Sequence, residues 1–268
     1  MKDLIKAIQD KNVILFVGSG VSANLGLPTF RGLINHMAEE LGYDPDIFNT
    51  LGDGDYLSLA EYYAIEKGAI GELRSWMDIN WHNHNIKIEE SDIHRLIVEL
   101  DFPIIYTTNY DRWLERAYDY YNVKYTKIMN VGNISDIKPS KTQIIKFHGD
   151  FNDDTSIVLT ESSYFERLNF EGPLDIKLRS DILGKSILFI GYSLNDINIK
   201  YLLFKVNQLW ERSPHSSLQP KSYVFLQKPN PIKEKILERR GIQTISSNED
   251  NPKEALTTFL SDLLKNLN

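Results

Sequence analysis

Four short polar motifs follow apolar, β-branched runs in this chain, and several of their side chains are of types that do chemistry. The motifs are Gly18-Ser19-Gly20, Thr108-Asn109-Tyr110-Asp111, His148-Gly149-Asp150 and Gly191-Tyr192-Ser193. His148 can take up a proton at neutral pH, since the unperturbed pKa of histidine is about 6.5. The carboxamide of Asn109 is an uncharged donor and acceptor that can position a sugar hydroxyl or a water molecule beside a developing cation.

The apolar runs before these motifs predict strands that are buried on both faces of a parallel sheet. The runs cover residues 13–17, 103–107, 143–147 and 186–190, with a fifth at 222–226. Helical patterns over 111–120, 174–183, 196–210, 232–239 and 252–267 alternate with them. This alternation predicts an α/β fold with a Rossmann-like, doubly wound parallel sheet. The carboxyl ends of such strands border the ligand crevice, so we expect the four motifs to meet in one cleft.

Two stretches interrupt the alternation. Residues 32–98 carry several helical patterns and no convincing strand, which predicts a helical subdomain inserted into a single domain spanning 1–268. Residues 151–172 form a second interruption, with a short strand expected at Ile157-Val158-Leu159. We expect this second segment to lie near the cleft.

Each motif also has a purely structural interpretation. The pattern Gly18-Ser19-Gly20-Val21-Ser22-Ala23 fits G-x-G-x-x-G/A, whose glycines let backbone N–H groups approach a phosphate, but a tight strand-to-helix turn needs the same glycines. Asp111 is a good N-cap for the helix that follows it. His148 could instead be a buried histidine that is hydrogen-bonded to the backbone. Residues 193–196 could instead cap the start of the helix that follows them.

Composition excludes several kinds of chemistry. The 268 residues include no cysteine, so there is no disulfide, thiolate nucleophile, iron–sulfur cluster or Cys-ligated zinc. The only histidine cluster, His82-Asn83-His84, has no third ligand nearby in sequence, and we expect no metal site. The net charge of −7 argues against direct nucleic-acid binding. A polar N-terminus and short apolar runs predict a cytoplasmic protein without a membrane segment.

The motifs, taken in order, resemble the motif series of the sirtuins. The resemblance rests on Gly18-Ser19-Gly20-Val21-Ser22, Gly26-Leu27-Pro28-Thr29-Phe30-Arg31, Thr108-Asn109-Tyr110-Asp111, His148-Gly149 and Gly191-Tyr192-Ser193. The amino-acid sequence at 157–161 and 191–196 is more similar to the divergent bacterial sirtuin-like branch than to the deacylases. Members of that branch act as NAD-consuming effectors in antiphage defence.

The resemblance implies an NAD+ glycohydrolase that cleaves the nicotinamide–ribose bond, with NAD as substrate. It implies catalytic roles for Asn109, which would orient water and ribose, and for His148, which would be the general base. It further implies that NAD is bound by Gly18, Ser19, Gly20, Phe30, Arg31, Asp111, Gly191 and Ser193. Phe30 and Arg31 would belong to a mobile loop that covers the cofactor.

Departures from the deacylases leave two other functions open. Ser19 stands where deacylase sirtuins usually have Ala, Thr108 where they have Gln, and their four-cysteine zinc module cannot exist here. The alternatives are an NAD-dependent deacylase or ADP-ribosyltransferase, and a catalytically silent subunit that senses NAD or ADP-ribose. A hydrolase of a universal cofactor must be silent until it is needed, so we expect control by homo-oligomerisation or by a second protein. The resemblance implies that such a partner could be a HerA-type DNA-translocating ATPase. We expect the contacts on the helical surfaces of 32–98 and on the C-terminal helix.

Overall fold

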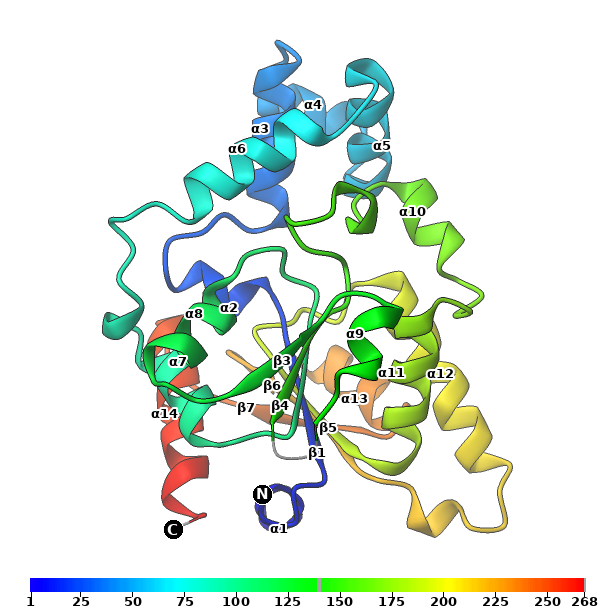
Figure 1. Cartoon of the computed structure of the whole chain (residues 1–268). Helices are drawn as coiled ribbons and strands as arrows, with labels where there is room; N and C mark the ends of the chain where they lie inside the picture. The colour runs from blue at the N-terminus through cyan, green and yellow to red at the C-terminus, as the bar shows by residue number, and fades with distance from the viewer. Residues whose placement is uncertain (139–140, 268) are drawn as a thin grey trace.

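The computed structural model describes residues 1–138 and 141–267 and centres on a seven-stranded parallel sheet (Figure 1). The strands are β1 Val13–Val17, β2 Ile104–Thr107, β3 Tyr125–Ile128, β4 Thr142–Lys146, β5 Ser186–Ile190, β6 Ser222–Leu226 and β7 Ile242–Ser246. Their order is β3-β4-β2-β1-β5-β6-β7, and every pairing is parallel. The sheet therefore extends outward from β1 in both directions, which confirms the predicted doubly wound fold.

Both faces of the sheet are covered by helices. Val13, Leu15 and Val17 of β1 belong to one apolar cluster, whereas Ile14 and Phe16 belong to another. The first cluster is completed by α1 Lys2–Gln9, α2 Ser19–Ala23, α7 Asp92–Glu99, α8 Trp113–Tyr120 and α14 Pro252–Lys265. The second is completed by α11 Pro173–Gly184, α12 Ile197–Glu211 and α13 Pro231–Arg239. Burial on both faces explains why the central strands are continuous apolar runs.

The stretch between β1 and β2 consists of helices and the loops that connect them. After α2 come α3 Phe30–Glu40, α4 Pro45–Leu51, α5 Tyr56–Lys67 and α6 Gly71–Trp81, which stand above the sheet in Figure 1, and then η1 Ile88–Glu90 and α7. Buried side chains of this stretch, among them Leu33, Tyr63 and Met77, belong to the same apolar cluster as β1. The helices thus share a core with the sheet, and their treatment as an inserted subdomain stays a prediction.

The short segment expected to be a strand at 157–159 is not one. These residues are irregular. Val158 donates its N–H to the carbonyl of His148 at 2.9 Å, and its own carbonyl accepts from the hydroxyl of Tyr110 at 2.7 Å. Both edges of β4 are already paired, with β2 and β3, so the sheet has no open edge there. The segment from β4 to α11 instead carries η2 Asp154–Ser156 and α10 Glu161–Glu166, and α9 Val131–Ser135 and η3 Ser216–Leu218 complete the elements.

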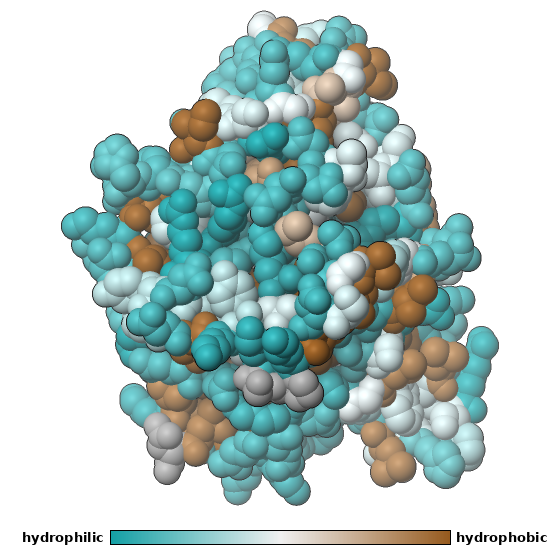
Figure 2. All heavy atoms as spheres, viewed as in Figure 1, coloured by the Kyte–Doolittle hydropathy of each residue, from teal (hydrophilic) through white to brown (hydrophobic). Residues whose placement is uncertain are grey.

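The surface in Figure 2 is mostly hydrophilic, with apolar side chains gathered on the side where α11 and α12 lie. The exposed apolar residues of these two helices include Ile176, Leu183, Tyr201, Phe204 and Leu209. Among the residues that the structure describes, no helix has the length and apolar character needed to cross a membrane.

The loops after β1 and β5 approach each other so closely that they require glycine. The N–H of Gly18 donates to the carbonyl of Ile190 at 3.0 Å, and that of Gly20 to the carbonyl of Gly191 at 2.9 Å. A Cβ on Gly18 would lie 2.4 Å from the Gly191 oxygen, and Gly191 itself has a φ of +57°. The glycines therefore let the two strand ends meet.

We expect Gly18→Ala to lower the free energy of unfolding by about 1–3 kcal/mol, because the new methyl group meets backbone atoms that cannot easily move. Gly184→Ala is the matched control, since a Cβ at that exposed end of α11 meets nothing within 4 Å. Urea denaturation of both variants measures the difference. Equal midpoints would contradict the close approach.

Candidate active site

A cavity of about 360 Å³ lies at the carboxyl ends of the central strands. Ser19 after β1, Asn109 after β2, His148 after β4 and Ser193 after β5 all contribute to its wall. These four strands are neighbours in the sheet, in the order β4-β2-β1-β5. The structure therefore brings together side chains that lie up to 174 positions apart in sequence, as the motif positions predict.

The residues expected to bind NAD divide into two groups. Ser19, Phe30, Asp111 and Ser193 line the cavity. Gly18, Gly20 and Gly191 instead form the contact between the loops after β1 and β5, and Arg31 is exposed on the first turn of α3. The contacts of all eight residues with NAD stay predictions.

The segment expected to be a covering loop is partly helical. Phe30 and Arg31 begin α3, after Thr29 in extended conformation, rather than lying in a loop. Leu27, Pro28 and Thr29, just before the helix, do line the cavity. The predicted loop is too long at its C-terminal end. Gly26 and Pro28 are strong turn signals, and they lie only a few residues before the helix begins at Phe30.

Asn109 is held rigidly at the end of β2. Its Nδ2 donates to the carbonyl of Gly18 at 3.1 Å and to Oγ of Ser22 at 3.0 Å, and its N–H donates to Oγ1 of Thr107. The side chain is buried at the cavity wall. Because both donations come from Nδ2, the carbonyl end of the amide is the acceptor that Asn109 can offer to a ligand.

Asp111 combines the two roles that the sequence left open. Its Oδ1 accepts the N–H of Trp113, the first residue of α8, at 3.1 Å, although the N-cap position itself is Arg112. The same buried carboxylate lines the cavity. Asp111 thus stabilises the start of α8 from the residue before the N-cap, rather than from the predicted N-cap position.

His148 is almost fully buried, with 3 % of the residue exposed. Its Nδ1 lies 3.4 Å from the hydroxyl of Tyr164, and its Nε2 lies 3.3 Å from Oδ2 of Asp196. Burial lowers the pKa of His148 to about 4, while Asp196 opposes that shift. The imidazole is therefore neutral at physiological pH and has a lone pair with which to take a proton.

Several cavity residues were missed by sequence reasoning. Trp81 at the end of α6, Tyr56 in α5 and Tyr164 in α10 come from helices outside the strand-end motifs. Tyr192 and Asp196 lie within or just after the fourth motif, where Asp196 was seen only as part of a helix cap. The strand-end rule finds residues that follow strands, so it has no means of finding side chains that helices bring over the cleft.

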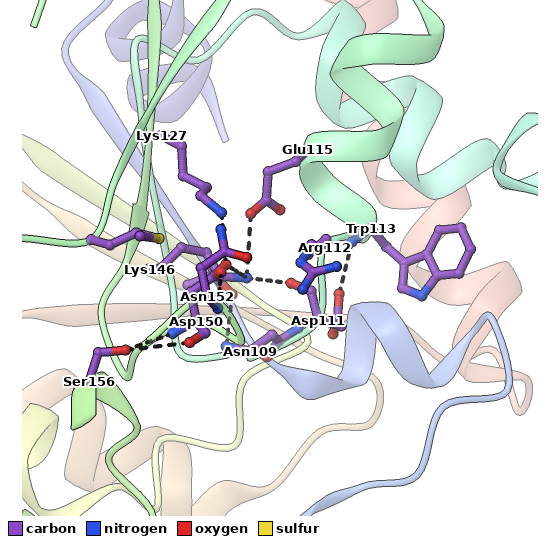
Figure 3. A network of polar contacts seen from close by, with 12 residues as sticks. Asn109, Asp111, Arg112, Trp113, Glu115, Lys127, Lys146, Asp150, Asn152 and Ser156 are labelled. Atoms are coloured by element: carbon purple, nitrogen blue, oxygen red, sulfur yellow. Dashed lines mark hydrogen bonds and ion pairs between the residues drawn. The ribbon is translucent and has the colours of Figure 1, made fainter. Parts of the chain in front are cut away.

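A buried charge network holds the loop after β2 against β4 (Figure 3). Nζ of Lys146 donates to the carbonyl of Asp111 and lies 3.6 Å from Glu115 and 3.9 Å from Asp150. Lys127 contacts the same Asp150 carboxylate at 3.1 Å. The side chains of Lys146 and Asp150 have no exposed surface, so this network sits in a low-dielectric interior and fixes the backbone beside Asn109.

His82 has a structural place in the described part of the chain. Its Nδ1 contacts Asp78 at 2.8 Å, and its Nε2 accepts the N–H of Arg112 at 2.9 Å. Across residues 1–138 and 141–267, no group of three or more His, Cys, Asp or Glu side chains could hold a metal ion. His82 therefore supports the loop after β2 through Arg112.

Comparison with known proteins decides the family. A model of the SIR2-like domain matches residues 103–245, more than half of the chain. This chain belongs to the SIR2-like family. The resemblance to bacterial sirtuin-like proteins that the motifs predict is therefore confirmed.

This SIR2-like chain is also similar in sequence to two named bacterial proteins. It is 30% identical over 218 residues to the NAD(+) hydrolase ThsA of Bacillus cereus strain MSX-D12, covering 79% of this chain and 43% of the relative. It is 27% identical over 259 residues to defense-associated sirtuin 2 of Bacillus subtilis, covering 92% of this chain and 24% of the relative. The chain thus spans less than half the length of either relative.

Solved structures include a Sir2 crystal structure with the inhibitor EX-527, 2'-O-acetyl-ADP-ribose and a deacetylated p53 peptide. It is 13% identical, covers 99% of this chain and 98% of its own, and has a TM-score of 0.46.

We expect Lys146→Met to lower the free energy of unfolding by about 3–5 kcal/mol, because it leaves the buried carboxylate of Glu115 without its ammonium partner and leaves Asp150 with Lys127 alone. Lys11→Met removes a lysine from an exposed pair with Asp101 and should cost under about 1 kcal/mol. Chemical denaturation measures both. A Lys146→Met variant as stable as Lys11→Met would contradict the network's role.

Two buried histidines predict how stability depends on pH. Burial lowers the pKa of both His94 and His148 to about 4, against 6.5 in the unfolded chain. The unfolded state therefore binds more protons in this window, so the free energy of unfolding is largest above pH 6.5 and falls toward pH 4. Denaturation at pH 6.5 and 5 should show this fall, and His94→Gln should reduce it. A flat profile would contradict the burial of neutral histidines.

Proposed function

We propose that this chain hydrolyses NAD+ at the nicotinamide–ribose bond and releases nicotinamide and ADP-ribose. The observation that carries the proposal is the meeting of Asn109 and neutral His148 at one cavity, at the carboxyl ends of four neighbouring strands. The cavity volume of about 360 Å³ is in the range of small-molecule sites.

The cavity offers suitable chemistry for each part of NAD. Phe30, Trp81 and Tyr192 provide aromatic wall for planar rings, and Ser19 and Ser193 provide hydroxyls for ribose or phosphate oxygens. Asp111 would hold the nicotinamide carboxamide by accepting from its NH₂ group. These contacts would orient the substrate so that its ribose faces Asn109 and His148.

The reaction needs little acid catalysis, because nicotinamide leaves as a neutral molecule from a cationic ring. Departure generates an oxocarbenium-like ribose, which a water molecule then attacks. The carbonyl of Asn109 would orient that water and the ribose hydroxyls, and His148 would accept the proton. Orientation can lower such a barrier by up to about 7–11 kcal/mol, and a positioned base adds about 10²–10⁴ in rate.

The relatives support both the activity and its setting. One is named an NAD(+) hydrolase and another a defense-associated sirtuin, and both align with most of this chain. We propose that hydrolysis here depletes NAD as an antiphage response. Homo-oligomerisation and a HerA-type partner ATPase stay predictions from the sequence.

Incubation of the protein with NAD tests the proposal. We expect nicotinamide and ADP-ribose in equal amounts, and a fall in turnover of about 10²-fold or more for Asn109→Ala and for His148→Ala. Asn248→Ala and His215→Ala are matched controls, since both residues are exposed and neither lines the cavity.

Three outcomes would contradict the proposal. The first is no nicotinamide release by the wild type, and the second is equal turnover in the wild type and both cavity variants. The third is release that requires an acylated peptide, which is the behaviour of a deacylase. Circular dichroism of each variant separates loss of fold from loss of chemistry.

A further inference from the structure

Both ring nitrogens of His148 face protein groups, although the residue itself lines the cavity. Nδ1 faces the hydroxyl of Tyr164 at 3.4 Å and Nε2 faces Oδ2 of Asp196 at 3.3 Å. The His148 and Asp196 side chains are 3% and 8% exposed. Tyr164 and Asp196 both line the cavity, so either group can stand between His148 and a bound ligand.

Tyr164 is held in place by contacts on both sides of α10. Thr160 caps the helix by accepting the N–H of Ser163 at 3.3 Å, and Ser162 donates to Glu61 of α5 through its N–H and its hydroxyl. One turn later, Arg167 donates to the carbonyl of Phe147, next to His148, at 2.5 Å. The phenol is therefore fixed relative to the end of β4.

Asp196 divides its two carboxylate oxygens between two tasks. Oδ1 accepts the N–H of Ile199 at 3.1 Å and so caps α12, while Oδ2 faces His148. The contact with Nε2 lacks hydrogen-bond alignment, and it becomes an ion pair only when the imidazole is protonated. Its effect is thus electrostatic: the carboxylate favours positive charge on the imidazole.

We propose that Tyr164 is a catalytic proton relay between the attacking water and Nδ1 of His148, and that Asp196 is a positioning residue that stabilises the imidazolium. The proposal rests on the proposed NAD hydrolysis. Nicotinamide leaves with the electron pair of the broken bond, and water then forms its bond to the oxocarbenium-like ribose carbon. The proton of the water passes to the Tyr164 oxygen while the phenolic proton passes to Nδ1.

The groups around Tyr164 keep its hydroxyl protonated, as the relay requires. Burial and the neighbouring Asp196 raise the pKa of Tyr164 above its ordinary value, so it stays a phenol that can donate and accept at once. The charged groups that act on His148 are Asp196 from α12, which favours its protonation, and Arg167 from the turn after α10, which opposes it. The hydroxyl of Tyr192 lies near the same carboxylate. After product release, the imidazolium returns its proton to solvent.

Three variants test the relay. We expect Tyr164→Phe to lower kcat by about 10- to 100-fold with little change in KM, because it removes the path for the proton but not the ring. We expect Asp196→Asn, which can still cap α12, to lower kcat and to move the acid limb of the pH profile to lower pH. Tyr118→Phe, which alters a buried phenol away from the cavity, should leave both constants unchanged.

Turnover within about twofold of the wild type in Tyr164→Phe, or a change in KM alone, would overturn the relay. If His148→Ala is inactive while Tyr164→Phe is active, the relay is wrong but the proposed hydrolysis still stands. Nitrogen NMR of the His148 ring tests Asp196 without any turnover: Asp196→Asn should lower the titration midpoint. An unchanged midpoint would overturn the positioning role.

Discussion

The candidate site depends on the parallel pairing of β4, β2, β1 and β5 as neighbours at the centre of the sheet. Each of these strands is buried on both faces, so its register is fixed by packing and its last residue has a defined position. The loops that follow then meet without further adjustment. Close approach of Gly18 to Gly191 on one side, and the bond from Lys146 to Asp111 on the other, complete the alignment.

The same burial that fixes the site also sets its chemistry. His148 lies in an environment that disfavours its charged form, and Asp196 limits that effect. Lys146, Glu115 and Asp150 are likewise buried, and burying such groups costs free energy that mutual attraction only partly offsets. The main role of these groups is therefore to position the backbone and protons. Stability comes mainly from the two apolar clusters on either side of the sheet.

Much of this arrangement could be predicted from the sequence, for physical reasons. The sequence predicts the central strands because burial on both faces makes them continuous apolar runs. It places Asn109 and His148 in one cleft because both follow the carboxyl ends of such strands. The edge strands β3 and β7 were missed, since partial exposure mixes polar residues such as Lys127 and Gln243 into them. Tyr164 and the Lys146 network were missed because long-range packing alone creates those contacts.

The central claim is that water, held by groups at this cleft, replaces nicotinamide on the ribose of NAD. Reaction of the protein with NAD in water enriched in oxygen-18, followed by mass spectrometry of the ADP-ribose, tests this most directly. The account predicts one labelled oxygen at the ribose carbon that carried nicotinamide, with one nicotinamide released for each labelled product. Product without label, or ADP-ribose attached to protein or to another acceptor, would contradict it.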